Sequence, residues 1–225
     1  MEMGAPTQYS AIHLISEARV NPEIWNQMPP EEIITRTVEE IKKRGIRILR
    51  AKNSEEALKR IKEIIPSGSV VMNGSSTTLI EIGYQTYVES GKSGWIDFHT
   101  LITNENDDAK RNELRRKSVT ADYFLSGVNA IAETGELVSC DKSGSRVGAW
   151  PFGAGHLILV AGINKIVPTL ADAFMRVREY ALPLENARAK KVYGIGSQLG
   201  KCVILVYEQD EKRSTLILIN ESLGY

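Results

Sequence analysis

A turn rich in glycine and hydroxyl residues is the first segment whose residue types suggest chemistry. The apolar run Val70-Val71-Met72 leads directly into Asn73-Gly74-Ser75-Ser76-Thr77-Thr78, where a helix is predicted to begin. Glycine lets backbone N–H groups approach a ligand, hydroxyl groups can donate hydrogen bonds, and a helix start favours an anion. The turn has neither the Gly-Lys-Ser/Thr ending of a Walker loop nor the spaced glycines of a dinucleotide-binding turn. An anion site and a plain helix cap by Ser75 or Ser76 both remain open.

A second polar segment, from Asn129 to Arg146, offers two acids and a cation. Glu133 or Asp141 could serve as a general base or nucleophile, and Arg146 could hold a carboxylate or phosphate through two parallel hydrogen bonds. Asn129 is a further candidate for ligand binding. Because loops are ordinarily polar, a hairpin that only carries surface charges is the alternative, and composition by itself favours it.

Asn164 and Lys165 form a third candidate, directly after the apolar run from 156 to 162. In α/β sheets ligands bind outside the carboxyl ends of the strands, so these side chains would project where a ligand is met. An exposed surface lysine is an equally good interpretation of Lys165. His156, at the opposite end of the run, is expected to be structural.

The elements that must position these residues alternate between strand and helix. Helices are predicted over about 31–44 and 53–65, from Thr77 onward, from Asn104 to about 119, and after Pro168; strands are predicted at 46–49, 69–72, 122–125 and 156–162. The segment 127–138 is typical of a hairpin that turns at Glu133-Thr134-Gly135, and 202–207 with 215–219 predicts a second hairpin. The expected fold is therefore α/β, an open, mostly parallel mixed sheet flanked by helices, with a C-terminal β-hairpin.

Composition limits the classes of partner. The 28 Lys and Arg residues balance the 28 Asp and Glu residues, and the formal net charge is 0. A nucleic-acid-binding chain usually has a basic excess, and the one basic cluster, at 110–117, follows acidic residues as in a helix that complements its own dipole. Nucleic acid is therefore not an expected partner.

The two cysteines, Cys140 and Cys202, are far apart in sequence and lack the spacing of metal ligands. Neither a disulfide framework nor a zinc site is indicated, and each cysteine is expected to be a small buried hydrophobic residue. No metal or iron–sulfur ligands are evident in the chain, and the sequence leaves any cofactor unknown.

The N-terminal segment lacks the charged and then apolar layout of a signal peptide, and no apolar run approaches the ~20 residues of a membrane span. The cytoplasm is the expected location. Residues 1–28 are predicted to form a helical extension, and residues 29–225 a single α/β domain.

Several segments in fixed order resemble those of one family, the lactate-utilisation or LUD-domain proteins. They are Asn73-Gly74-Ser75-Ser76-Thr77-Thr78, Ser126-Gly127-Val128-Asn129-Ala130-Ile131, Gly144-Ser145-Arg146-Val147, Gly162-Ile163-Asn164-Lys165-Ile166-Val167, Arg178-Glu179-Tyr180-Ala181-Leu182-Pro183 and Asn220-Glu221-Ser222-Leu223-Gly224-Tyr225. The similarity runs from about residue 10 to the last residue. Relatives often carry a cysteine-containing stretch where this chain has Ala189 to Lys201, which contains no cysteine, so the resemblance does not carry a cluster-binding role to this chain.

The resemblance implies the fold of glucosamine-6-phosphate deaminase, ribose-5-phosphate isomerase and the CoA transferases. It also implies a part in the oxidation of L-lactate to pyruvate beside an iron–sulfur oxidoreductase. Together with the turn from Gly74 to Thr77, the resemblance predicts a small anionic metabolite as the ligand. Two alternatives stay open: a non-catalytic accessory or sensor subunit, and an enzyme acting on sugar phosphates or acyl-CoA. Whether the chain is itself an enzyme is left undecided by its residues.

Overall fold

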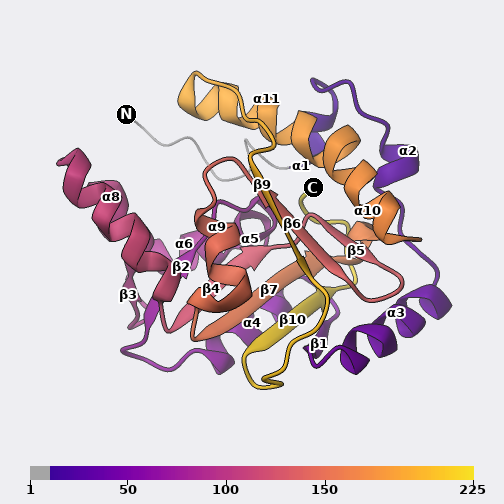
Figure 1. The fold of residues 1–225 in the computed structure, drawn as a ribbon, viewed down its shortest axis with the longest axis horizontal. Coiled ribbons are helices and arrows are strands. Elements are labelled where there is room, and N and C mark those ends of the chain that lie inside the picture. The colour runs from indigo at the N-terminus through magenta and orange to yellow at the C-terminus, as the bar shows by residue number, and fades with distance from the viewer. Residues whose placement is uncertain (1–10) are drawn as a thin grey trace.

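A parallel sheet forms the centre of the computed structural model, which describes residues 11–225 (Figure 1). Within those residues six strands make up this sheet. Their order is β1 (Arg47–Ala51), β10 (Ser214–Ile219), β7 (His156–Gly162), β4 (Tyr123–Gly127), β2 (Val70–Asn73) and β3 (Ile96–Asp97). All neighbours pair in parallel, so their carboxyl ends meet at one edge of the sheet.

Helices connect these strands, as crossover connections between parallel strands require. They are α4 (Ser54–Ile64), α5 (Thr77–Glu81), α6 (Tyr84–Glu89), α7 (Phe98–Asn104) and α8 (Asp108–Lys117), and a further helix, α3 (Glu31–Lys43), precedes β1. Amphipathic spacing explains α4, whose Ala57 and Ile61 are buried against Ile158 and Ile217 of the sheet. The predicted helices at 31–44 and 53–65 are confirmed.

A smaller sheet packs on the other face of the large one. Its order is β8 (Ile166–Val167), β5 (Ala130–Ala132), β6 (Leu137–Asp141) and β9 (Lys201–Leu205). The predicted hairpin with its Glu133-Thr134-Gly135 turn is confirmed as the antiparallel pair β5–β6, and Gly135 takes the positive φ of 100° that the turn needs.

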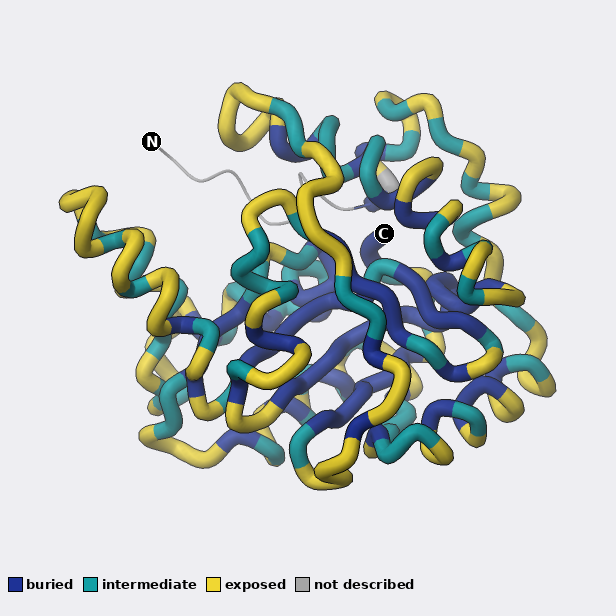
Figure 2. The backbone as a smooth tube through the Cα atoms, viewed as in Figure 1, coloured by how far each residue is buried: buried dark blue, intermediate teal, exposed yellow. Residues whose placement is uncertain are grey.

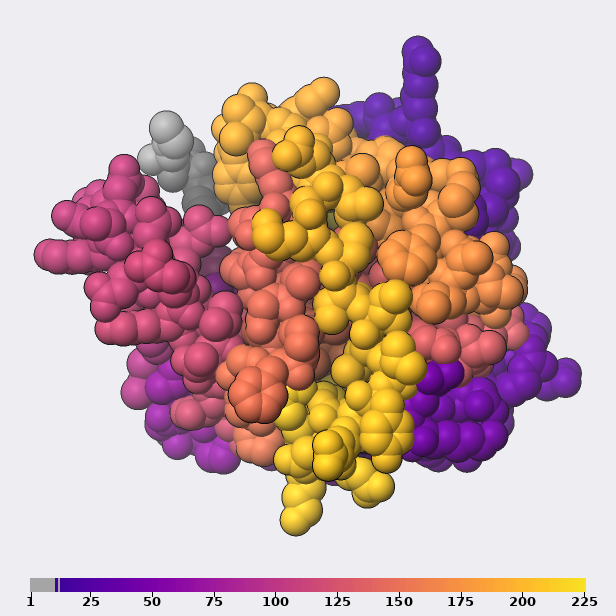
Figure 3. Space-filling model, viewed as in Figure 1, coloured from indigo at the N-terminus to yellow at the C-terminus, as the bar shows by residue number. Residues whose placement is uncertain are grey.

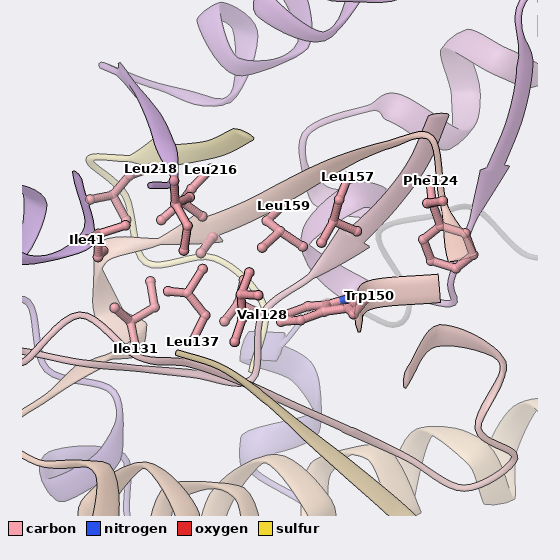
Figure 4. Close-up of a cluster of buried hydrophobic side chains, with 14 of the residues drawn as sticks. Ile41, Phe124, Val128, Ile131, Leu137, Trp150, Leu157, Leu159, Leu216 and Leu218 are labelled. Carbon is pink, nitrogen blue, oxygen red and sulfur yellow. The ribbon is translucent and has the colours of Figure 1, made fainter. Parts of the chain in front are cut away.

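Apolar side chains from both sheets meet in one shared core (Figure 4). Leu157 and Leu159 of β7 point toward Ile131 and Leu137 of the small sheet, and the fully buried Trp150 closes one side. Trp150 belongs to a π-helical turn, η3 (Ala149–Gly153), that follows the short helix α9 (Ser145–Gly148). The molecule is thus layered as the helices α4 to α6, the large sheet, the small sheet together with α3 and α7, and a second helical layer.

The second helical layer covers the outer face of the small sheet (Figures 1 and 2). It consists of α10 (Leu170–Arg176), the π-helical turn η5 (Val177–Ala181) and α11 (Leu182–Tyr193). Two short helices near the N-terminus, α1 (Ala11–Ile15) and α2 (Pro22–Trp25), lie beside it, and Leu14 is buried against Tyr180 and Leu184. The predicted division into 1–28 and 29–225 stays a prediction, and residues 1–10 lie outside the described part.

The predicted C-terminal hairpin is wrong, because β9 and β10 belong to different sheets. Every residue of β10 is buried, so this strand needs cover on both faces and finds it between β1 and β7. The first two residues of β9 are exposed, and β9 pairs with β6 at the edge of the small sheet. The segment 206–213 is therefore a connection between sheets.

The predicted start of the polar helix at Asn104 is also wrong. Asn104 is the last residue of α7, and Asp107 caps α8 by accepting a 2.8 Å hydrogen bond from the Lys110 backbone N–H. A short carboxylate three residues before a free N–H satisfies the helix start directly. α8 has no buried residue and projects from the body of the molecule (Figure 2). Within residues 11–225 no helix is long and apolar enough to cross a membrane.

Gly45 provides a test of the connection between the sheets. Its φ is 74°, and a β-carbon there would overlap the backbone carbonyl oxygen of Glu208, whose N–H donates a 2.8 Å bond to the Arg44 carbonyl. We expect Gly45→Ala to destabilise the protein by about 1–3 kcal/mol more than Gly68→Ala. Gly68 is the matched control, because its φ is also positive but nothing lies within 4 Å of the added carbon. Urea unfolding of both variants measures the difference, and equal losses would contradict the packing of 206–213 on the end of α3.

Candidate functional site

A pocket of about 420 Å³ opens at the carboxyl ends of β2, β4 and β7. Its remaining walls come from the β6–α9 connection, α11, the segment before β9, and the C-terminus. Chemically important lining residues are Gly74, Ser75, Ser76, Thr77, Thr78, Arg115, Asn129, Cys140, Asp141, Lys142, Arg146, Lys165, Glu185, Arg188 and Tyr225. The segment that holds Ile195–Leu199 and leads into β9 lies across this face of the molecule (Figures 1 and 3).

The predicted turn after β2 lies in the pocket wall. Ser76 caps α5 by accepting a 3.3 Å bond from the Leu79 N–H, so the cap interpretation holds while Gly74 to Thr78 also lines the pocket. Gly127 of β4 passes so close that a β-carbon there would overlap the Ser76 hydroxyl oxygen. Asn73 is buried behind the turn and does not line the pocket.

Arg146 reaches the pocket from the β6–α9 connection and packs against the turn. A β-carbon on Gly74 would lie 3.3 Å from the Arg146 Cδ, so this glycine leaves room for the arginine. Arg146 Nη2 donates to the Cys140 carbonyl, and within residues 11–225 no group accepts a hydrogen bond from its Nε or Nη1. Burial lowers the pKa of Arg146, although nearby Asp141 opposes this. The guanidinium therefore retains donors for a ligand.

The two candidate catalytic carboxylates are separated by the hairpin. Asp141 lines the pocket, but its carboxylate accepts from the backbone N–H groups of Gly144, Arg146 and Val147, the last two at 3.0 and 3.1 Å. It therefore shapes the loop that presents Arg146. Glu133 lies at the far turn of the hairpin, where it pairs with Arg36, and the structure does not bring it to the pocket.

Lys165 is buried at the base of the pocket, with 1% of its surface exposed, so the interpretation as a surface lysine is wrong. Its Nζ donates a 2.8 Å hydrogen bond to Thr78 Oγ1. Burial lowers its pKa well below the usual value; Arg176 and Arg146 lower it further, and Glu81 opposes them. The amine therefore gives up its proton far more readily than an exposed lysine.

Asn164 and Asn129 mainly organise neighbouring chain segments. Asn164 does not line the pocket; its amide donates to Asn26 Oδ1 at 2.7 Å, and its Oδ1 accepts from the Leu223 N–H at 3.1 Å. Asn129 does line the pocket, and its Oδ1 accepts from the Cys140 N–H at 2.9 Å.

A triad on α11 and the C-terminus, with Arg188 and Tyr225 buried and Glu185 partly exposed, was not predicted as part of the site. Arg188 donates from Nε and Nη2 to the two oxygens of Glu185, both at 2.8 Å, and the Tyr225 hydroxyl donates to Glu185 Oε2 at 2.7 Å. Burial raises the pKa of Glu185, but Arg188, Tyr225 and Arg146 lower it, and the net shift is downward. The sequence indicated only that Glu185 and Arg188 could pair on a helix surface. The one sequence signal for their role was the resemblance of the segments around Arg178–Pro183 and Asn220–Tyr225.

The charge around the pocket is predominantly positive. Among the described residues that line it, five have side chains that are cationic at ordinary pKa values and two have carboxylate side chains. The cations are Arg115, Lys142, Arg146, Lys165 and Arg188. Both carboxylates already accept hydrogen bonds, Asp141 from backbone N–H groups and Glu185 from Arg188 and Tyr225. Such a site is suited to an anion that brings its own negative charge.

These features define an α/β protein with an anion-suited pocket at the carboxyl ends of a parallel sheet. The sequence matches the LUD domain over residues 34–207, and the chain belongs to this family. A search of curated proteins gives no significant match.

Two of the solved structures that match this chain differ in the strength of the likeness. A DUF162 family protein from Deinococcus radiodurans, solved at 1.70 Å resolution, matches with a TM-score of 0.50 and 13% identity, over 85% of this chain and 100% of that one. A D-ribose-5-phosphate isomerase in complex with phospho-erythronic acid matches with a TM-score of 0.32 and 13% identity, over 52% of this chain and 54% of that one. The first likeness shows that the α/β fold is shared.

Lys165→Met tests whether the lowered pKa of the buried Lys165 amine makes the stability of the protein depend on pH. The pKa of Lys165 is lower in the folded protein than in the unfolded chain, so the unfolded chain binds more protons between the two pKa values, and the stability of the wild type rises with pH through that window. We therefore expect Lys165→Met to raise the melting temperature at pH 7 by about 2–4 °C, the shift that about 1 kcal/mol produces in a chain of this size. The gain should shrink as the pH approaches 10.

Lys92→Met is the matched control, because Lys92 is exposed. Melting curves followed by circular dichroism at several pH values measure both variants. A pH-independent effect of Lys165→Met, or an equal effect of Lys92→Met, would contradict a buried amine with a lowered pKa.

Proposed function

We propose that this chain is a metabolite-binding component of lactate oxidation and that its pocket holds a small anion. The observation that carries the proposal is the convergence of the Gly74–Thr78 turn with Arg146 and Lys165 in one pocket. Family membership supports the metabolic context, and the geometry supports the chemical class of the ligand.

The turn and the two cations supply complementary parts of an anion site. Gly74 to Thr78 offers hydroxyl groups and backbone at the start of α5, and Arg146 offers two guanidinium nitrogens without protein acceptors among residues 11–225. Lys165 adds an amine whose one hydrogen-bond acceptor in the described chain is Thr78 Oγ1. A carboxylate or phosphate bound between them would raise the pKa of Lys165 and keep the amine protonated.

The pocket has room for more than a three-carbon acid. Its volume of about 420 Å³ lies within the usual range for small-molecule sites, roughly 300–1,000 Å³. Exposed apolar side chains, Tyr193 and Ile195, stand at its rim and suit the uncharged part of a larger ligand. Sugar phosphates and acyl-CoA fragments therefore belong beside lactate and pyruvate in any ligand screen.

A second candidate function, an accessory or sensor subunit of an iron–sulfur oxidoreductase, is favoured by one observation. Both pocket carboxylates are already engaged, Asp141 by three backbone N–H groups and Glu185 by Arg188 and Tyr225. The site therefore has hydrogen-bond donors for an anion, while both carboxylate side chains already accept hydrogen bonds within the protein. Such a site suits ligand binding and sensing.

Arg146→Gln tests the anion site. A ligand at 100 times its Kd stabilises a protein by about 2.7 kcal/mol, so we expect the preferred anion to raise the melting temperature of the wild type by several degrees. Arg146→Gln should lose most of that rise, because it removes the charge and the free donors. A thermal-shift screen with phosphate, lactate, pyruvate, sugar phosphates and acyl-CoAs makes the measurement.

Arg36→Gln is the control variant, since Arg36 pairs with Glu133 away from the pocket. Gly74→Trp, which places a large side chain beside Arg146, should also abolish the response. The proposal would be abandoned if no anion shifted the wild type, or if all variants responded alike.

Partner capture tests the accessory role. We expect the tagged full chain, purified from its native cells under anaerobic conditions, to retain an iron–sulfur protein that mass spectrometry identifies. Recovery of the chain without such a protein would count against the accessory function and leave the anion site to be judged by the thermal shifts.

A further inference from the structure

The two cysteines, which the sequence presents as unrelated, face each other across the small sheet. Cys140 of β6 and Cys202 of β9 are direct partners in the antiparallel register. Side chains of directly opposed residues lie on the same face of a sheet, with β-carbons about 4.5–5.5 Å apart. The expectation of a small buried hydrophobic residue is confirmed for Cys140 and is wrong for Cys202, which is exposed.

The backbone hydrogen bonds identify the kind of pair that the cysteines form. The Cys140 N–H donates to Asn129 Oδ1, and the Cys140 carbonyl accepts from Arg146 Nη2, so both groups point away from β9. The neighbouring Asp141 carbonyl instead accepts from the Gly200 N–H. Cys140 and Cys202 are therefore a non-hydrogen-bonded pair, in which α-carbons lie about 4.5 Å apart. That separation falls within the range of about 4.4–6.8 Å that a disulfide spans.

The environments of the two thiols differ in a way that sets the order of reaction. Cys140 is buried in a cluster with Val138 and Val177, whereas Cys202 lies on the exposed edge strand. Burial, followed by the facing Cys202 thiol, raises the pKa of Cys140. An oxidant from solvent therefore meets Cys202 first, and Cys140 is held in position to react with the product.

We propose that Cys140 and Cys202 form a redox modification site that a peroxide closes to a disulfide. The Cys202 sulfur attacks the peroxide, the O–O bond breaks, and Cys202 becomes a sulfenic acid with release of water or an alcohol. The Cys140 sulfur then attacks the Cys202 sulfur; the S–S bond forms, the S–O bond breaks, and the leaving hydroxide takes the Cys140 proton as water. The two thiols lose two electrons in total, and the peroxide gains them.

The bond would join two walls of the pocket. β9 directly follows Ile195–Leu199, and Cys140 itself lines the pocket beside Asp141 and Arg146. In the reduced protein, hydrogen bonds such as Lys142 Nζ to the Gly196 carbonyl at 3.0 Å fasten this wall. β9 is an edge strand with much of its length exposed, so the covalent link would restrict a segment held by little burial.

Intact-mass spectrometry of the reduced full chain, before and after hydrogen peroxide, tests the modification. We expect the wild type to lose two hydrogen atoms without dimerising and to give a cross-linked Cys140–Cys202 peptide that a reductant separates. Cys140→Ala should stop at the sulfenic acid, which dimedone traps on Cys202, and Cys202→Ser should react far more slowly. Wild-type protein that gives only sulfinic acid or intermolecular dimers would overturn the proposal.

Hydrogen exchange tests the consequence for the pocket wall. We expect oxidation to slow exchange in residues 195–205 at least several-fold relative to the reduced protein, and a reductant to restore it. The segment 108–117 of α8 is the internal control, because it lies away from both cysteines and should not change. Unchanged exchange in 195–205 of a protein shown by mass to carry the disulfide would overturn the claim that the bond fastens this wall.

Discussion

The insertion of β10 between β1 and β7 is the constraint on which the rest of the structure depends. β10 stands second in the sheet order, next to the edge strand β1, although it is the last strand of the chain, and its six residues are all buried. Because it runs parallel to β7, the chain leaves it at the carboxyl edge of the sheet, where the pocket lies. The final residues then fold back over that edge: the Leu223 N–H donates to Asn164 Oδ1, the Gly224 N–H to Glu81 Oε2, and Tyr225 to Glu185.

Several cations are buried near this edge of the sheet, and each is accommodated by different partners. Burying a charge without partners costs several kcal/mol, so each cation needs its own arrangement. Arg188 has Glu185, which Tyr225 also contacts, and Arg176 donates to the backbone carbonyls of Trp25 and Asn129. Lys165 has only the neutral Thr78 hydroxyl within hydrogen-bonding distance in the described chain, and its burial, followed by the nearby Arg176, lowers its pKa. Ionisable groups with shifted pKa values cluster at functional sites, and a bound anion would stabilise the protonated form of Lys165.

The walls of the pocket that come from the two sheets differ in how much apolar burial holds them in place. The turn after β2 and Lys165 rest on the large sheet, whose strands are covered on both faces by apolar clusters. The opposite wall depends on β9, which pairs with one strand only and has an exposed start. The floor of the pocket is thus held by extensive apolar burial and the opposite wall by much less, and Cys140 and Cys202 face each other between β6 and β9 in this wall.

The sequence by itself determined the features that depend on local pattern. Amphipathic spacing and caps located α3 and α4, the glycine of a tight turn located the β5–β6 hairpin, and an apolar run ending in Asn73–Thr78 located a turn that does line the pocket. Tertiary structure alone decided what depends on pairing between distant segments. The sequence of an apolar strand such as β10 does not indicate which strands it pairs with. Because β10 follows β9 in the sequence, a hairpin was predicted. That hairpin does not form, because β10 is buried on both faces between β1 and β7. For the same reason only the folded chain shows that Lys165 is buried, that Asp141 and not Glu133 reaches the pocket, that Arg188 and Tyr225 share Glu185, and that Cys140 opposes Cys202.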